Sequence, residues 1–396
     1  MRTAYRIPLA IAACVAALAL PGAAAASPNL LFGLFDDSQT FGNTTEAFGF
    51  YDELRPEIIR VTIHWDEVAP TRPAKAADPL DPAYNWESID NVAIQASSRG
   101  IELVATIVGA PAWANGGKSA ASVPFKARSL RKFARQLKKF SRAAARRYSG
   151  TESTQYAGLP VISHWTAWNE PNLPIFLKPQ YIRKKTKSGK RVFVRRSPVI
   201  YAAICNAVHR GVHQAGDELN VDEQVACGVT APGGNNNPRS SRPTISPLLF
   251  LRDLKRAGAK FDAYAHHPYP GSPLERPNDR PKISTRISLG SIWRLIRQID
   301  RLYGDDMPIW ITEYGYQTNP PDGIFGVKPK KQAKYLELAH GIALANPRID
   351  MLIWFLLRDE AIPAEGSTAG WQSGLLKADG KAKRSFRTYK SLTGSG

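Results

Sequence analysis

The sequence predicts an eight-stranded β/α barrel, and three observations support this fold class. Short apolar runs that resemble buried strands occur eight times, with helical segments between most of them. Glycine or asparagine follows most of these helical segments, as expected where a helix ends in a left-handed residue. Stretches rich in proline and glycine follow strands at 231–243, 268–281 and 317–329. A β/α barrel keeps its functional loops at such positions.

The predicted elements alternate along the chain. Each predicted strand is a short apolar run, and each predicted helix carries apolar residues at helical spacing. The predicted strands are 30–35, 58–65, 101–108, 164–169, 224–230, 261–266, 309–312 and 351–356. The predicted helices are 45–54, 87–98, 129–148, 198–215, 246–257, 289–303, 329–345 and 383–392.

An open, doubly wound sheet is the alternative fold, because it has the same alternation of elements. It is disfavoured because the segment 32–37 after the first strand lacks the glycine spacing of a phosphate-binding loop. The chain has no internal repeat and no linker composition. We therefore expect one barrel domain over residues 27–396, a size that single β/α barrels with loop insertions reach.

Residues 1–26 have the pattern of a secretory signal peptide. Arg2 and Arg6 give a basic start, residues 7–20 are apolar apart from Pro8, and alanines at 24–26 offer a cleavage site. The apolar segment is too short to span a bilayer, and no other stretch is apolar enough. We therefore expect a secreted, extracellular protein without a membrane span.

The chain is strongly basic, with a formal net charge of +19. This charge fits either a generally basic exported protein or one that acts on an acidic substrate. Nucleic acid is disfavoured as a partner, because the sequence has no helix-turn-helix, zinc-finger or RNA-stacking signature and export separates the chain from it.

Two segments concentrate the positive charge. On the predicted helix 129–148, basic residues recur at helical spacing opposite an apolar face, which indicates a solvated outer surface. The second segment, 178–196, follows the fourth strand and has a centre, TKSGK, that is typical of a hairpin tip. This basic loop is interpreted either as a solvated loop or as a site that recognises a uronic acid, phosphate or sulfate on a sugar chain.

Two cysteines remain after the signal peptide. Cys205 lies within a predicted helix and Cys227 within the next strand, at similar heights in a barrel. A disulfide and a pair of buried free thiols both fit this placement.

Two glutamates lie at the ends of predicted strands. Glu170 occurs in HWTAWNEPN (164–172), and Glu313 occurs in PIWITEYGY (308–316). Each glutamate ends an apolar run. Proline directly follows Glu170, and the pair Tyr-Gly follows Glu313, so a strand-breaking residue comes next in both cases. Two carboxylates delivered to one end of a barrel are what cleavage of a glycosidic bond requires.

These motifs resemble the clan A retaining glycoside hydrolases. The resemblance rests on WNEPN at the fourth strand, HPY (267–269) after the sixth and TEYG (312–315) at the seventh. Together with the segment GAPAWA (109–114), they look most like family 39, with family 5 as the near alternative. Known family 39 xylosidases carry an extra β-sandwich, for which this chain has no room. The resemblance implies that Glu313 is the nucleophile and Glu170 the acid/base.

The resemblance also implies a set of substrate-binding residues. Asn169 would hold the sugar 2-hydroxyl, Arg60 would support the nucleophile, Tyr269 would donate a hydrogen bond to it, and His267 would line the pocket. An arginine within an apolar strand such as 58–63 needs a buried carboxylate partner.

Four tryptophans at or after strand ends are candidate platforms for sugar rings, because aromatic faces stack on the apolar faces of sugars. Clan A members typically place such a tryptophan at the end of strand eight, which favours Trp354. Core packing is the alternative for each of the four: Trp65, Trp113, Trp354 and Trp371.

No metal or other cofactor is predicted, because no His-x-x-x-His or His-Glu-x-x-His spacing occurs and hydrolysis by two carboxylates needs none. No Gly-x-Ser-x-Gly elbow indicates a serine esterase. The expected function is retaining hydrolysis of an extracellular poly- or oligosaccharide by a monomer, with endo action favoured. The alternatives are a non-catalytic barrel that binds an anionic glycan, and an exo-acting arabinofuranosidase or xylosidase.

Overall fold

The computed structural model describes residues 27, 30–150, 159–280, 283–362 and 370–394. The predicted signal peptide, 1–26, lies outside the described residues. Among the helices that are described, none is long and apolar enough to cross a membrane.

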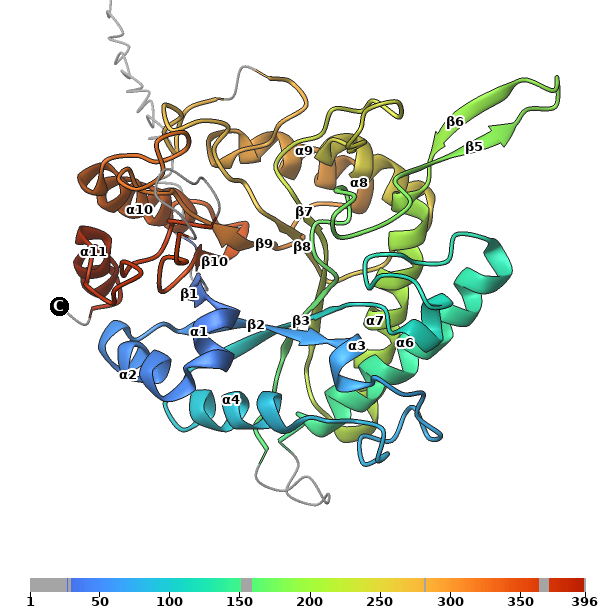
Figure 1. Cartoon of the computed structure of the whole chain (residues 1–396), viewed down its shortest axis with the longest axis horizontal. Helices are drawn as coiled ribbons and strands as arrows, with labels where there is room; N and C mark the ends of the chain where they lie inside the picture. Colours follow the sequence, from blue (N-terminus) through green and yellow to red (C-terminus); the bar gives the residue numbers. More distant parts are fainter. Residues whose placement is uncertain (1–26, 28–29, 151–158, 281–282, 363–369, 395–396) are drawn as a thin grey trace, which may run out of the picture.

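The predicted barrel is confirmed. Eight parallel strands close in the order β1-β10-β9-β8-β7-β4-β3-β2, and helices surround the ring (Figure 1). The strands of the barrel are β1 (Leu31–Phe35), β2 (Ile58–His64), β3 (Glu102–Val108), β4 (His164–Ala167), β7 (Gln224–Thr230), β8 (Ala263–His266), β9 (Ile309–Tyr314) and β10 (Ile349–Phe355).

The crossover segments between the strands are mostly helical, as predicted. The sequence pattern did not predict the short helices α1, α3 and α5, and it gave the 3-10 turn η1 and the helix α9 as one helix. The helices are α1 (Asp37–Gly42), α2 (Thr44–Leu54), α3 (Trp65–Val68), α4 (Glu87–Ser97), α5 (Ala112–Asn115), α6 (Ala127–Arg147), α7 (Ser197–Leu219), α8 (Pro247–Arg256), η1 (Leu289–Ser291), α9 (Ile292–Tyr303), α10 (Pro329–Leu344) and α11 (Arg384–Leu392).

One predicted helix boundary is wrong. The helix expected to end before Gly216 continues to Leu219, and Asn220, with φ 56°, is its left-handed stop. Gly216 serves a different purpose, because a Cβ there would lie 2.7 Å from the carbonyl oxygen of Val221 and 2.4 Å from the carboxylate of Glu223. The glycine therefore lets the returning chain pass close to the helix.

Two apolar layers hold the fold together. A small cluster fills the inside of the barrel, and a larger one lies between the strands and the surrounding helices. On β10, Met351 and Ile353 belong to the inner cluster, whereas Leu352 and Trp354 belong to the outer one. This alternation follows from the period of two along a strand, and it decides which side chains reach the site.

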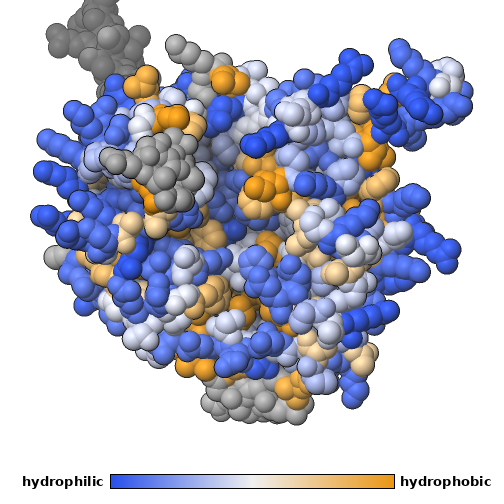
Figure 2. All heavy atoms as spheres, viewed as in Figure 1, coloured by the Kyte–Doolittle hydropathy of each residue, from blue (hydrophilic) through white to orange (hydrophobic). Residues whose placement is uncertain are grey.

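The predicted hairpin tip is confirmed. An antiparallel pair, β5 (Tyr181–Lys185) and β6 (Arg191–Arg195), projects from the barrel at the upper right of Figure 1. Its surface is hydrophilic in Figure 2. Six of its cations are exposed, namely Arg183, Lys184, Lys185, Lys187, Lys190 and Arg191. Arg195, in contrast, pairs with Asp253 on α8.

A disulfide joins Cys205 on α7 to Cys227 on β7. Of the two states that the sequence left open for these cysteines, the structure has the bonded one. The bond fastens α7 to the outer face of the barrel wall.

Candidate active site

The two glutamates meet at the carboxyl end of the barrel. Glu313 lies within β9, and Glu170 follows the end of β4 by three residues. One carboxylate oxygen of each lies, together with a ring nitrogen of His267, within a group whose atoms are all within 4.8 Å of one another. Both side chains are largely buried, with exposed fractions of 12% for Glu170 and 10% for Glu313.

Arg60 organises the site from the inside of the barrel. Its Nη1 donates to Oε1 of Glu313 at 2.6 Å and its Nε donates to Oγ1 of Thr106 at 2.9 Å. The Arg60 side chain is only 1% exposed. The expected buried carboxylate partner of this strand arginine is therefore present, and it is Glu313.

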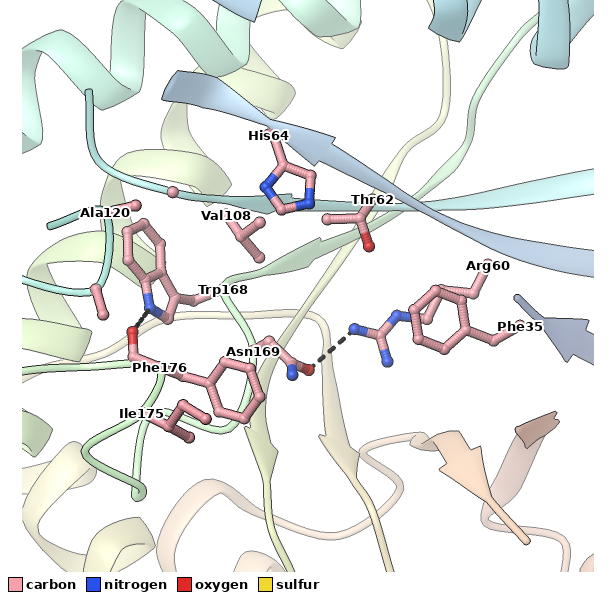
Figure 3. Close-up of a pocket in the computed structure, with 12 residues that line it drawn as sticks. Phe35, Arg60, Thr62, His64, Val108, Ala120, Trp168, Asn169, Ile175 and Phe176 are labelled. Carbon is pink, nitrogen blue, oxygen red and sulfur yellow. Dashed lines mark hydrogen bonds between the residues drawn. The ribbon is translucent and has the colours of Figure 1, made fainter. Parts of the chain in front are cut away.

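Asn169 is the second partner of this guanidinium. Nη2 of Arg60 donates to Oδ1 of Asn169 at 3.0 Å. Because arginine only donates hydrogen bonds, the amide oxygen must face Arg60, and the amide NH2 is left to donate to a ligand. Figure 3 shows Asn169 reaching toward Arg60 across the cavity.

His267 is fully buried between the two glutamates, with its Nδ1 3.0 Å from Oε1 of Glu170 and 3.5 Å from Oε2 of Glu313. Its Nε2 faces two donors, the hydroxyl of Thr312 at 3.0 Å and Nη1 of Arg60 at 3.4 Å. Nε2 therefore accepts, and the neutral ring carries its proton on Nδ1. That proton is donated to Oε1 of Glu170, 3.0 Å away.

Tyr269 completes the contacts of Glu313. Its hydroxyl donates to Oε2 of Glu313 at 3.1 Å, so each oxygen of this carboxylate accepts a hydrogen bond. Arg60, Asn169, His267 and Tyr269 were all expected at the site, and the structure brings all four together with the two glutamates.

Burial shifts the pKa values of Glu170 and His267 in opposite directions. Burial raises the pKa of Glu170 from 4.5 to about 7, although the positive charge of Arg60 opposes the shift. Burial lowers the pKa of His267 from 6.5 to about 4, which keeps the ring neutral near pH 7. Glu170 can therefore carry a proton near neutral pH, while His267 does not.

The backbone turns sharply on leaving β4. Trp168 and Glu170 have positive φ values of 67° and 34°, which cost of order 1–3 kcal/mol each for residues other than glycine. Nε1 of Trp168 donates to the carbonyl of Phe176 at 2.7 Å and anchors this turn. Such conformations gather at functional sites, and here they place Glu170 against His267.

A cavity of about 300 Å³ opens beside the site. Arg60 and Asn169 contribute to its wall, and the rest is mainly apolar, with Phe35, Trp168 and Phe176 among the lining residues (Figure 3). Figure 2 shows a hollow in the middle of this face with hydrophobic surface at its edge. An apolar cavity with a few convergent polar groups is the usual form of a ligand site.

Two of the tryptophans expected as sugar platforms lie in the core, so the expectation is wrong for them. Trp65 is 1% exposed and stacks on Phe140 of α6. Trp354 is 0% exposed, and its Nε1 donates to the carbonyl of Ser373 at 2.9 Å. Both belong to the layer between strands and helices, because each lies on the side of its strand or strand end that faces away from the barrel axis.

Trp113 is partly exposed but is not part of the cavity wall. Its Nε1 donates to the carbonyl of Ala69 at 2.8 Å, and its ring packs edge-on against Trp65. The structure therefore places it beside the site and not in it.

Phe355 and Trp371 take the place that was expected for Trp354. Phe355, one residue further along β10, packs against Trp371 and Tyr269, with ring centroids 5.5 and 6.2 Å apart. Trp371 is 45% exposed and lies 6.0 Å from the Tyr269 ring. Phe355 was missed because β10 is apolar on both faces, so the sequence does not reveal which face is turned inward.

The trio Glu170, His267 and Glu313 could also be considered as metal ligands. The guanidinium of Arg60 lies 2.6 Å from Oε1 of Glu313, and its charge opposes a cation there. The absence of a metal and of a cofactor stays a prediction.

The fold and the site define a class: a (β/α)8 barrel with a buried acid and a second carboxylate side by side at the carboxyl end of its strands. Several solved structures are similar to this chain and share its fold. One is a family 39 glycoside hydrolase from Bacteroides cellulosilyticus WH2, which is 16% identical in sequence and has a TM-score of 0.61. The match covers 92% of this chain and 63% of that one. A glucosidase from Croceicoccus marinus matches with 16% identity and a TM-score of 0.62 over 93% and 67%. A family 39 β-xylosidase from Caulobacter crescentus matches with 17% identity and a TM-score of 0.55 over 95% and 73%.

At these identities, the likeness establishes a shared barrel fold. The chain spans 63% of the length of the Bacteroides structure. No family model matches the sequence, and no curated protein matches it.

Proposed function

We propose that the protein is a retaining O-glycoside hydrolase of clan A, most similar to family 39. The observation that carries this proposal is the approach of Glu170 and Glu313: one carboxylate oxygen of Glu170 lies within 4.8 Å of one carboxylate oxygen of Glu313. Retaining enzymes hold their carboxyl groups about 5–5.5 Å apart, whereas inverting enzymes need about 6.5–9.5 Å to admit a water. The similarity of the barrel to solved glycoside hydrolases supports the same conclusion.

The contacts of the site suggest the role of each residue. The Glu313 carboxylate, oriented by Arg60 and Tyr269, attacks the anomeric carbon while Glu170 gives its proton to the departing oxygen. In the second step Glu170 takes a proton from water, and the water oxygen displaces Glu313 from the anomeric carbon. The raised pKa of Glu170 suits the donor role in the first step. The free amide NH2 of Asn169 is placed to hold the 2-hydroxyl of the sugar.

We propose further that the enzyme is secreted and cleaves an extracellular poly- or oligosaccharide at internal bonds of the sugar chain. The pattern of residues 1–26 supports export. The long loops after the strands favour an open groove and therefore endo action. The β5–β6 hairpin follows Glu170 along the sequence. Its exposed cations favour a substrate with uronic acid, sulfate or phosphate groups.

The test is product analysis with residues 27–396 and a panel of neutral and anionic polysaccharides. We expect the wild type to release oligosaccharides from one of them and the Glu313→Gln variant to release none. Release of monosaccharides alone would exclude endo action and indicate an exo-acting enzyme such as an arabinofuranosidase or xylosidase. Binding of an anionic glycan without turnover would show that the protein is a non-catalytic glycan-binding barrel and not an enzyme.

The role of the hairpin needs a matched comparison of charges. Lys184, Lys187 and Lys190 are exposed on the hairpin, and their change to glutamine should raise KM for an anionic polymer several-fold at low salt. The control is the same neutralisation of Arg131, Lys132 and Arg135, which are exposed on α6. Equal increases in KM for the two variants would show that the net charge of the protein attracts the polymer and that the hairpin is not a specific binding site.

A further inference from the structure

A second cluster of ligand-type side chains lies on the outer wall of the barrel. His209 and His213 are one turn apart on α7, and both face Asp262, which immediately precedes β8. Nε2 of His209 lies 3.3 Å from Oδ1 of Asp262, and Nε2 of His213 lies 2.7 Å from Oδ2. The two imidazole rings have centroids 4.4 Å apart.

This cluster is separate from the candidate active site. Asp262 lies at the amino end of β8, whereas His267, which contacts Glu170, follows its carboxyl end. The two ends of a barrel strand have different roles: the carboxyl end carries catalysis and the amino end serves stability. Any ligand of the cluster would therefore be a structural one.

The geometry meets the requirements of a transition-metal site. One ligand atom from each of the three residues lies within 4.8 Å of the others, so a modest rotation of the side chains would bring them to one ion. Two histidines at i and i+4 on a helix form a recurrent half-site for zinc, and a carboxylate is a common third ligand. The side chains are 20%, 34% and 31% exposed, so an ion could enter from solvent.

A hydrogen bond from the backbone also orients the carboxylate of the cluster. Asp262 is held in place by the amide of Val225, which donates to its Oδ2 at 2.8 Å. Such a supporting hydrogen bond orients a ligand before an ion arrives.

We propose that His209, His213 and Asp262 bind a divalent transition-metal ion, best matched by Zn²⁺, with water in the remaining position. The ion would replace the imidazole–carboxylate hydrogen bonds and clamp α7 to the connection between β7 and β8. The Cys205–Cys227 disulfide already fastens the preceding turns of the same helix. The metal site would extend this attachment toward the end of α7.

The test is calorimetric titration of residues 27–396, freed of chelators and of any affinity tag, with Zn²⁺ alone. We expect one site of micromolar or tighter affinity, and at least a tenfold weaker affinity in His209→Gln and in His213→Gln. Zinc at about 100 times the wild-type Kd should raise the unfolding temperature of the wild type by about 3 °C, and that of each variant by at most about half as much.

Two controls separate this site from other histidines and from the active site. His164 pairs with a single carboxylate, Glu102, and His164→Gln should keep the wild-type zinc affinity. Glu313→Gln, which removes a ligand from the catalytic trio, should keep it as well. The proposal is overturned if zinc does not bind, or if the affinity survives in both the His209 and His213 variants. Loss of binding in Glu313→Gln alone would place the ion in the active site and likewise overturn it.

Discussion

The pH dependence of hydrolysis should follow the protonation of Glu170, because the first step needs a proton from this group. Burial raises its pKa from 4.5 to about 7. The protonated, active fraction is then about 90% at pH 6 and about 10% at pH 8. We therefore expect kcat/KM to fall roughly tenfold between these two values. With an unshifted pKa, only about 3% of the enzyme would be active at pH 6.

The assay is kcat/KM between pH 3.5 and 9 on an aryl glycoside of the sugar that the polysaccharide panel identifies. Glu170→Gln cannot donate a proton, so its cleavage of a substrate with an unactivated leaving group should be lost. With a dinitrophenyl leaving group, which departs without protonation, the variant should still form the glycosyl-enzyme. The rate at which the variant forms the glycosyl-enzyme should then show no alkaline decline near pH 7.

Two results would contradict a raised pKa of Glu170. An alkaline midpoint near 4.5 would mean that burial does not raise this pKa. An unchanged decline near pH 7 in Glu170→Gln would assign that titration to another group. His267 is not a candidate for it, because burial lowers its pKa to about 4.

Loss of Arg60, of Trp371 or of the Cys205–Cys227 disulfide should each have a measurable effect. Arg60→Met should lower the free energy of unfolding by about 3–5 kcal/mol at pH 7, measured in denaturant, since it leaves buried Glu313 without its partner. Trp371→Ala should lower kcat/KM about 2- to 10-fold on an oligosaccharide, because its half-exposed ring borders the site. Reduction of Cys205–Cys227, which are 22 residues apart, should cost about 3 kcal/mol of unfolding free energy.

A loss of unfolding free energy below about 1 kcal/mol in Arg60→Met would mean that solvent screens the Arg60–Glu313 pair. Trp354→Phe is the control for Trp371: it should lower stability and leave KM unchanged, and the reverse pattern would restore Trp354 as the sugar platform. An unfolding curve that reductant does not shift would show that the two cysteines are not bonded in solution.

The barrel could be predicted because each of its strands is buried on both faces. Buried strands appear in the sequence as short apolar runs that need no partner to be recognised. The same property hides their orientation. On β10 both Trp354 and Phe355 are apolar, and only the closed ring shows that Phe355 lies toward the site and Trp354 toward the helices.

Among polar groups, the sequence was more informative. Arg60 lies in an apolar strand, so a buried carboxylate partner could be required without knowing the fold. The identity of that partner, and the link that His267 makes between Glu170 and Glu313, depend on strands far apart in the chain. Contacts of this kind follow from closure of the barrel and not from local pattern.

The basic segment 178–196 shows the same division. Its hairpin tip could be predicted from the turn residues, but the pairing of Arg195 with Asp253 of α8 could not. The structure separates the exposed cations of the hairpin from one that serves to fix its base.

The central claim is that Glu313 forms a covalent bond to the sugar while Glu170 acts as acid and base. Incubation with a set of 2-deoxy-2-fluoro glycosides carrying good leaving groups, followed by peptide mass spectrometry, tests it most directly. We expect a glycosyl adduct on the peptide that contains Glu313, and none in Glu313→Gln. An adduct on another residue, or hydrolysis that gives a product of inverted configuration without any adduct, would contradict it.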